Sequence, residues 1–354
     1  MVEVDAAFIQ ALEHRPKPAV VEAEGIPLID LSAINSSDSA AVAALAAEIG
    51  RACETWGFFQ VINHGVPLAC REKMESASRK FFAQSLDEKL KVRRDEKNPV
   101  GYHDGEHTKN VRDWKEVYDF VQKVPTIIPA SPEPDDREVV LLRNQWPDYP
   151  PNFREVWEEY VVEIEKLAHK LLELISLSLG LPGNRFMNFF DDQTSFLRLN
   201  YYPRCPVPDL ALGVGRHKDA VGMTVLAQDD VGGLEVRRKS DGEWVRVKPT
   251  PNAYIINVGD IIQVWSNDRY ESVEHRVTLN SERDRFSIPF FFNPAHTTVV
   301  EPLEELVDEH SPPKYRAFNW GKFVAARNLS NYKKLHVDNL QIYHFSLSAL
   351  NDLH

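Results

Sequence analysis

Three residues with metal-binding side chains stand at a notable spacing in the second half of the chain. His217 and Asp219 are two residues apart, and His275 follows at the start of another apolar run. In an extended segment alternate side chains share a face, so His217 and Asp219 point to the same side. Two imidazoles and one carboxylate from neighbouring strands can hold non-haem Fe(II) and leave coordination positions open. By itself the pattern also arises by chance among ordinary surface and core residues.

A pair of polar residues further along the chain strengthens the case for a binding site near His217, Asp219 and His275. Arg285 and Ser287 also stand two apart, in the otherwise apolar run RFSIPFFF. A guanidinium that points into a β core needs an anion, because its charge cannot be buried unpaired. With a hydroxyl beside it, the natural ligand is a small carboxylate. An internal salt bridge or an outward-facing arginine is the alternative.

Three further positions could contribute to the same site. Asn200 and Tyr202 share one face of the run FLRLNYY and could supply hydrogen bonds to it. Lys218 lies between the two predicted metal ligands, so alternation sends its side chain to the opposite face. There it is either solvated or in contact with a substrate at the entrance. His103 and His107, in a charged segment, are expected to be solvated.

The elements that must position these residues are short strands. From residue 195 to about residue 294 the hydrophobic period is two, with turn pairs such as Gly232-Gly233 between the runs. Eight short strands with hairpin-sized loops indicate a sandwich or barrel. The predicted strands are FLRLNYY, MTVLAQ, GLEVRR, WVRVKP, AYIINV, IIQVWS, HRVTL and RFSIPFFF.

Helices are predicted outside this region. One begins at a cap supplied by Asp38 or Ser39, another follows Pro67, and the strongest amphipathic pattern runs from Phe153 to Gly180. The last should pack along a sheet. Residues 88–116 are rich in charge and poor in periodicity, which predicts a long exposed loop that carries binding function.

Composition limits the classes of function. The chain has 354 residues, 53 acidic against 41 basic, and a net charge of −12, which disfavours nucleic acid and anionic membranes as partners. Three scattered cysteines suit a reducing compartment rather than a disulfide framework. We find no signal peptide, transit peptide or membrane span, so the prediction is a cytoplasmic protein.

Four ordered motifs identify a family. The motifs NYYPRCP from Asn200, GRHKD from Gly215, SVEHRV around His275 and RFS from Arg285 resemble the signature of plant-type Fe(II)- and 2-oxoglutarate-dependent dioxygenases. This family includes flavonol synthase, anthocyanidin synthase, and the gibberellin and jasmonate oxidases. The likeness extends to IPLIDL, WGFFQVINHGVP and GLEV, and covers most of residues 20–345.

The resemblance implies a mainly β fold with flanking helices. Its core would be a distorted double-stranded β-helix, or jelly roll, similar to isopenicillin N synthase. We expect four regions in the chain. They are an N-terminal mixed α/β region (1–125), a linker with a long supporting helix (126–194), the jelly-roll catalytic core (195–300) and a C-terminal helical segment near the barrel mouth (301–354).

By carry-over from the family, each motif acquires a role. His217, Asp219 and His275 would bind iron. Arg285 and Ser287 would hold the distal carboxylate of 2-oxoglutarate, and Tyr202 and Asn200 would assist around this cosubstrate. O₂ is the second cosubstrate, and ascorbate the expected reductant in assays. Expected substrate contacts are Tyr102, His103, Lys218, Phe292 and Tyr343.

The predicted activity is oxidation of a small, mostly apolar plant metabolite with release of succinate and CO₂. The metabolite would be a flavonoid, another phenylpropanoid, a hormone or an alkaloid, brought close to the site by Ile288, Phe290 and Phe292. The outcome could be hydroxylation, desaturation, demethylation or ring closure. Alternatives are a 2-oxoglutarate-independent oxidase of the same fold, a non-catalytic binding protein and a zinc hydrolase. We expect a monomer or weak dimer.

Overall fold

Two β-sheets form the centre of the molecule. The computed structural model describes residues 5–17, 21–22, 26–95, 98–332 and 340–347. The large sheet contains, in spatial order, β2 (Leu28–Asp30), β3 (Phe58–Ile62), β15 (Tyr254–Val258), β12 (Met223–Gln228), β17 (Arg285–Phe292), β10 (Phe196–Tyr202), β7 (Glu116–Val121) and β4 (Tyr102–His103). The small sheet contains β1 (Val21–Glu22), β14 (Trp244–Arg246), β13 (Leu234–Arg237), β16 (His275–Val277) and β11 (Val214–His217).

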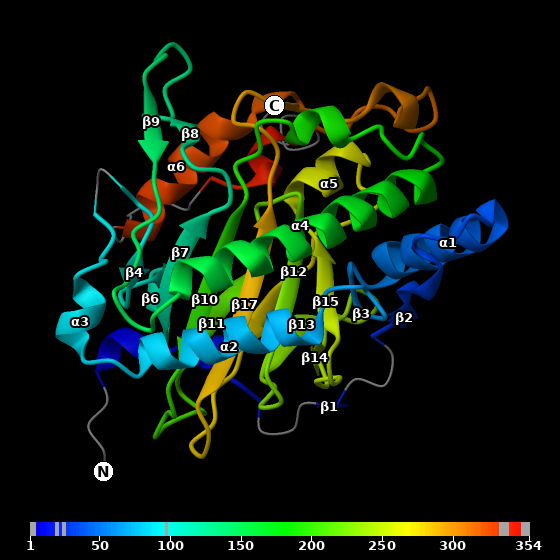
Figure 1. Cartoon of the computed structure of the whole chain (residues 1–354). Helices are drawn as coiled ribbons and strands as arrows, with labels where there is room; N and C mark the ends of the chain where they lie inside the picture. The colour runs from blue at the N-terminus through cyan, green and yellow to red at the C-terminus, as the bar shows by residue number, and fades with distance from the viewer. Residues whose placement is uncertain (1–4, 18–20, 23–25, 96–97, 333–339, 348–354) are drawn as a thin grey trace.

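Helices cover one side of the large sheet. In Figure 1, α2 and α4 run across the strands, with α1 beside them. The helices are α1 (Ser39–Thr55), α2 (Leu68–Phe82), α3 (Leu86–Leu90), α4 (Phe153–Ser178), α5 (Asp260–Trp265) and α6 (Trp320–Tyr332). Three two-stranded pairs complete the β structure: β5 (His107–Thr108) with β6 (Val111–Arg112), β8 (Thr126–Pro129) with β9 (Val139–Leu142), and β18 (Val299–Val300) with β19 (Phe318–Asn319).

Short 3₁₀ turns connect these elements. They are η1 (Ala6–Phe8), η2 (Leu12–His14), η3 (Leu31–Ala33), η4 (Met187–Phe190), η5 (Glu304–Leu306) and η6 (Ile342–Phe345). None of the helices in the described part of the chain is long and apolar enough to cross a membrane.

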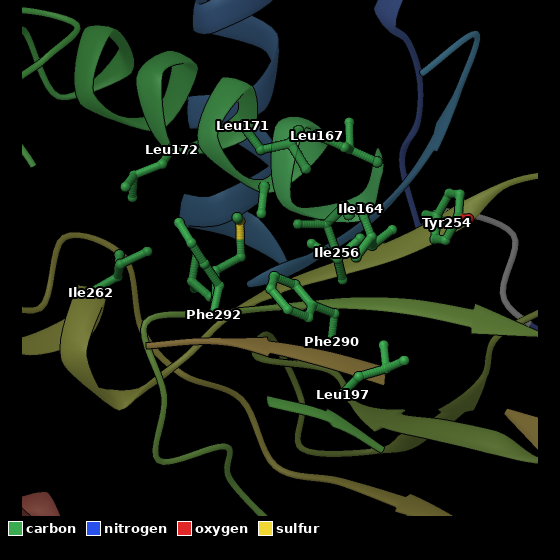
Figure 2. Close-up of a cluster of buried hydrophobic side chains, with 14 of the residues drawn as sticks. Ile164, Leu167, Leu171, Leu172, Leu197, Tyr254, Ile256, Ile262, Phe290 and Phe292 are labelled. Atoms are coloured by element: carbon green, nitrogen blue, oxygen red, sulfur yellow. The ribbon is translucent and has the colours of Figure 1, made fainter. Parts of the chain in front are cut away.

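The large sheet separates two hydrophobic cores. The larger core lies between this sheet and the helices, and Figure 2 shows Phe290 and Phe292 of β17 pointing toward the leucines of α4. The smaller core lies between the sheets and joins Tyr202 of β10 to Val236 of β13 and Val277 of β16. We call the side of the large sheet that faces the small sheet its interior face. Because side chains alternate, Arg285 and Ser287 lie on the interior face, opposite Phe290 and Phe292.

The predicted helices form where local signals place them. Asp38 caps α1 by accepting a hydrogen bond from the Ala40 amide, as the sequence predicts. The amphipathic run that begins at Phe153 forms α4, which packs against β12 and β17 of the large sheet. These elements depend on contacts within a few residues and one apolar stripe, so their pattern is visible in the sequence.

One predicted strand is wrong. The run IIQVWS belongs to α5, which begins after Gly259. Every residue of α5 is buried, so the run shows neither alternation nor an amphipathic stripe, and a short apolar run of this kind does not distinguish strand from helix. The turn is held by tertiary bonds, in which the amides of Asp260 and Ile261 donate to the carbonyls of Asp219 and Val221.

The segment 88–116 is not the exposed loop that its composition predicts. It contains the end of α3, then β4, β5 and β6, and several of its charged side chains are buried. Lys89 pairs with Glu116, and Lys115 pairs with Glu106 and Asp113. Buried charges are tolerated when they are paired, and such pairing leaves no periodic trace in the sequence.

Candidate active site

The structure brings together the three predicted metal ligands. Nε2 of His217 and Nε2 of His275 each lie 3.5 Å from Oδ1 of Asp219, and all three ligand atoms lie within 4.8 Å of one another. His217 ends β11 and His275 begins β16, the two strands being paired at these residues. Asp219 lies two residues beyond the end of β11. Among the described residues, this is the one group of three or more His, Cys, Asp or Glu side chains that could hold a metal ion.

Backbone carbonyls orient both imidazole rings. Nδ1 of His217 lies 2.9 Å from the carbonyl oxygen of Gly215, and Nδ1 of His275 lies 3.1 Å from that of Val273. A carbonyl only accepts, so Nδ1 carries a proton in each ring, and in the neutral ring the lone pair of Nε2 is free to bind a metal ion. Burial lowers the pKa of His275 to about 4, which keeps this ring neutral near pH 7.

Two polar side chains of the large sheet hold Asp219. The hydroxyl of Thr224 on β12 and the amide of Asn257 on β15 donate to Oδ2, at 2.7 and 2.8 Å. Burial raises the pKa of Asp219, but His275 and His217 in their protonated forms, together with the hydrogen bond from Thr224, outweigh burial, and the net shift is downward. The carboxylate is therefore ionised, with Oδ1 left toward the two histidines.

Arg285 is buried without a full set of partners. The residue is 3% exposed, its Nη2 donates to Oε1 of Gln228 at 3.0 Å, and the guanidinium lies 4.8 Å from the ring centre of Tyr202. Nε and Nη1 have no hydrogen-bond partner among the described residues. Buried polar groups are almost always satisfied, so these nitrogens indicate that a ligand completes the site.

The other predicted polar residues lie around this guanidinium. Asn200 on β10 pairs in register with Ser287, and its Nδ2 lies 3.3 Å from the Ser287 hydroxyl oxygen. Oδ1 of Asn200 and Nε2 of Gln228 are also buried without partners in the described part of the chain. Free donors and an acceptor thus converge beside one fixed cation, an arrangement suited to a small dicarboxylate.

The residues fit the iron and the cosubstrate that their chemistry predicts. Two imidazole nitrogens and one carboxylate oxygen form the facial set typical of non-haem Fe(II). Thr224 and Asn257 supply the outer hydrogen bonds that orient a ligating carboxylate. The unsatisfied guanidinium of Arg285 supplies a charged fork for a carboxylate.

Two predicted substrate contacts are contradicted by their positions. Phe292 is fully buried against Phe190 and His169 under α4. Tyr102 is 1% exposed, packs on Phe81, and donates its hydroxyl to Glu116. Both lie in the larger core, and so do Ile288 and Phe290. The expectation that these residues line the site is wrong. On its own strand each of them alternates with the residues of the interior face, so its side chain points to the helices instead.

The remaining predicted contacts have different surroundings. His103 pairs with Val117 on the interior side of β4 and is only 5% exposed, so its expected solvation is also wrong. Lys218 is half-buried. Burial raises the pKa of Asp260, and the positive charge of Lys218 offsets part of this rise. Tyr343 is 53% exposed in η6, where its ring stacks on His344. His107 is half-buried in β5.

Sequence reasoning missed several interior residues. Thr224, Gln228 and Asn257 hold Asp219 or Arg285, and they are polar residues of the mostly apolar strands β12 and β15. Such isolated polar positions with the parity of an interior face are the signal that could have found them. Phe196 and Phe291, whose rings stack 4.6 Å apart, were missed as aromatic residues of the interior face.

Two family profiles match the chain. Residues 193–294 match the 2OG-Fe(II) oxygenase superfamily. Residues 26–149 match the family described as non-haem dioxygenase in morphine synthesis N-terminal. The first match contains His217, Asp219, His275 and Arg285, the polar residues that converge at the site.

Individual relatives agree with these profiles. Jasmonate-induced oxygenase 2 of Arabidopsis thaliana is 38% identical over 323 residues, which cover 90% of this chain and 83% of that protein. The crystal structure of JOX2 in complex with 2OG, Fe and JA matches with a TM-score of 0.77 and 34% identity, covering 92% of this chain and 89% of that one. A full-length Neurospora crassa protein, solved in complex with alpha-KG and thymine, matches with a TM-score of 0.75 and 26% identity, covering 89% and 100%. The chain therefore belongs to the Fe(II)- and 2-oxoglutarate-dependent oxygenases and is a 2-oxoglutarate-dependent dioxygenase with a jelly-roll core.

Proposed function

We propose that His217, Asp219 and His275 hold the catalytic Fe(II), and that Arg285 and Ser287 hold the distal carboxylate of 2-oxoglutarate. The observation that carries the assignment is the buried, incompletely bonded guanidinium of Arg285 on the same sheet face that holds Asp219 through Thr224. Buried polar groups are almost always hydrogen-bonded, and a ligand carboxylate would complete the bonding of Arg285. Asn200 and Tyr202 complete the cosubstrate subsite.

The protein residues bind and orient the reactants. When bound, the metal with 2-oxoglutarate supplies O₂-dependent oxidation of a C–H bond, coupled to formation of succinate and CO₂. Arg285 fixes one end of the cosubstrate through charge and two N–H groups, and Ser287 adds a hydroxyl. Thr224 and Asn257 keep Oδ1 of Asp219 turned toward the histidines. Such fixed geometry lowers the entropic cost of bringing the reactants together.

The substrate is a small, mostly apolar metabolite. Phe196 and Phe291 have the parity of the interior face, are half-buried, and stack on each other. Phe291 pairs in register with Thr224, which bonds to Asp219, so this aromatic pair lies in the row of the sheet next to the proposed iron ligands. Aromatic surface beside the site favours burial of rings or hydrocarbon.

The related structures bind different small molecules. JOX2 is described in complex with JA, and the Neurospora crassa protein in complex with thymine. We propose a plant metabolite of the phenylpropanoid, hormone or alkaloid classes for this chain. Hydroxylation, desaturation, demethylation and ring closure all use the same set of iron ligands. The reaction outcome therefore depends on the position and orientation of the bound substrate.

The decisive experiment is a metabolite screen with two readouts. Purified protein with Fe(II), ascorbate and 2-oxoglutarate is incubated with plant extract fractions. We expect succinate in proportion to a product that has gained one oxygen atom, or lost two hydrogens or a methylene group. Product formation without succinate would favour the 2-oxoglutarate-independent alternative. Absence of both, in protein shown to bind iron, would favour a non-catalytic binding protein.

A further inference from the structure

A second arginine of β10 has the same parity as the cosubstrate residues. Arg198 lies two positions before Asn200, so its side chain is on the interior face. Its Nε and Nη2 donate to the two carboxylate oxygens of Asp119, at 2.7 and 2.8 Å, and Asp119 pairs with it in register across β7. Its Nη1 donates to both oxygens of Glu106, at 3.0 Å each. Two carboxylates therefore engage all three nitrogens of this guanidinium.

The network extends from Arg198 to the strand of the first proposed iron ligand. Lys115 pairs with Glu106 and with Asp113. Asp113 accepts a hydrogen bond from the amide of Gly215, two residues before His217. The network thus links β10 to β11.

The cations of this network are matched by carboxylates. Glu106, Asp113 and Asp119 surround Arg198 and Lys115, and burial raises the pKa of Asp113. Burial raises the pKa of Glu106, but Arg198 and Lys115 outweigh burial and hold it well below its usual range. His103 adds no positive charge, because burial lowers its pKa well below the ordinary value.

Arg198 and Arg285 therefore differ in what they offer a ligand. Arg285 keeps two nitrogens without partners in the described part of the chain, whereas all three nitrogens of Arg198 donate to carboxylates. A carboxylate that approached Arg198 would have to displace Glu106 or Asp119. It would also meet their negative charge, and like charges held in a low dielectric repel strongly.

We propose that Glu106 determines the charge of the substrate by occupying Arg198, so that the site accepts neutral or cationic molecules and excludes carboxylates. This inference rests on the proposed function and narrows its substrate class. It separates this chain from any relative whose substrate is an acid. Glu106 is a specificity-determining residue in this assignment and takes no part in the oxidation.

The test measures binding of three matched probes: cinnamate, methyl cinnamate and cinnamylamine. The full chain is loaded with Fe(II) and saturating 2-oxoglutarate without O₂, so that Arg285 is occupied and cinnamate cannot bind there. Calorimetry gives a dissociation constant for each probe. We expect the wild type to bind the ester and the amine more tightly than the acid.

Glu106→Gln keeps the shape of the side chain and removes its charge. We expect it to shift the ratio of acid to ester affinity toward the acid by about tenfold or more. Asp119→Asn frees the other side of Arg198 and should shift the ratio in the same direction. The shift should disappear when Arg198→Gln is added to Glu106→Gln.

Glu235→Gln is the matched control. Glu235 is a buried carboxylate that also binds two arginines, Arg246 and Arg276, but its parity on β13 is opposite to that of Leu234 and Val236, which pack between the sheets. We expect its loss to leave the acid-to-ester ratio unchanged. Equal melting temperatures and equal 2-oxoglutarate affinity identify the variants that are folded and suitable for comparison.

Three results would overturn the proposal. The first is wild-type affinity for cinnamate equal to or above that for its ester. The second is an unshifted ratio in folded Glu106→Gln, including the case in which neither protein binds the acid. The third concerns Arg327 of α6, whose Nη1 donates to the carbonyl of Leu340 and to Oε1 of Gln341. Acid binding that is lost in Arg327→Gln would place the anion site on α6. Succinate formation is scored separately, so failure of the proposed function would appear there and not in these ratios.

Discussion

The two faces of β17 are similarly buried, but only the interior face carries polar side chains. Ile288, Phe290 and Phe292 point toward the helices and fill a core in which apolar surface meets apolar surface (Figure 2). Arg285 and Ser287 point to the interior face and are just 3% exposed, yet part of the Arg285 guanidinium has no partner among the described residues. Depth alone therefore does not distinguish structural from functional residues. The difference lies in whether the buried groups are satisfied.

This contrast divides the expected effects of mutation. Substitutions on the helix-facing side should lower the free energy of unfolding and leave ligand affinity unchanged. Substitutions on the interior face should weaken ligand binding and leave the free energy of unfolding nearly unchanged. The reason is that an unsatisfied or ligand-holding group contributes little to stability without its ligand. Four predictions test this division, beginning with the one of largest expected effect.

Asp219→Ala should abolish turnover. Loss of the single carboxylate ligand is expected to lower iron affinity by more than about 100-fold, since even outer-shell changes cost roughly 10- to 100-fold. Iron content after gel filtration and succinate release measure the two effects, and circular dichroism checks the fold. Full turnover in folded Asp219→Ala would refute the ligand assignment.

Phe292→Ala should destabilise the protein without changing its chemistry. Truncating a fully buried phenylalanine typically costs about 3–5 kcal/mol of unfolding free energy. Urea unfolding measures the loss, and the apparent affinity for 2-oxoglutarate should remain that of the wild type. Phe291→Ala, on the other face of β17, is the matched variant. Phe291→Ala should lower the free energy of unfolding less than Phe292→Ala does, and should change the coupling of succinate release to substrate oxidation. A larger loss of stability in Phe291→Ala, with unchanged coupling, would contradict the assignment of the two faces.

Arg285→Gln should weaken cosubstrate binding. Removing one partner of a buried charged pair costs about 2–5 kcal/mol, which corresponds to roughly 30-fold or more in affinity for 2-oxoglutarate. Titration of the Fe(II)-loaded protein measures it. Arg283→Gln is the control, because Arg283 is an exposed arginine near the start of the same strand and pairs with Asp230. An unchanged affinity in Arg285→Gln would rule out the proposed role.

Thr224→Val should have the smallest effect. It removes one of the two hydrogen bonds to Oδ2 of Asp219 while keeping the size of the side chain. We expect about a tenfold lower iron affinity, with a melting temperature close to that of the wild type. The loss of iron affinity in Thr224→Val should be smaller than the loss in Asp219→Ala. An equal loss would contradict the assignment of Thr224 as a residue that only orients the carboxylate.

Much of the fold and of the candidate site could be predicted from the sequence. Seven of the eight predicted strands form, and the structure brings His217, Asp219 and His275 together. Spacing of two along a strand places side chains on one face whatever the rest of the fold does. The same rule, applied to Phe290 and Phe292, already places them opposite Arg285. That error was one of inference rather than of missing information.

Other features required the folded chain. The run IIQVWS is apolar throughout and becomes α5 because tertiary hydrogen bonds hold its first turn. The charged segment 88–116 is partly buried because its charged groups find partners on other elements, as Lys89 finds Glu116 and Glu106 finds Arg198. Charge composition is the same for a solvated loop and for a buried network.

The sequence by itself determined the chemical types, their parity on each strand and the family to which they belong. Only the tertiary structure decided which polar groups are satisfied. Thr224 and Asn257 bond to Asp219, Arg198 bonds to Glu106 and Asp119, and Arg285 has Gln228 as its one hydrogen-bond partner among the described residues. The physical reason is range. Parity follows from backbone geometry between neighbouring residues, whereas hydrogen-bond and charge pairing depend on which distant strands the fold brings within about 3 Å.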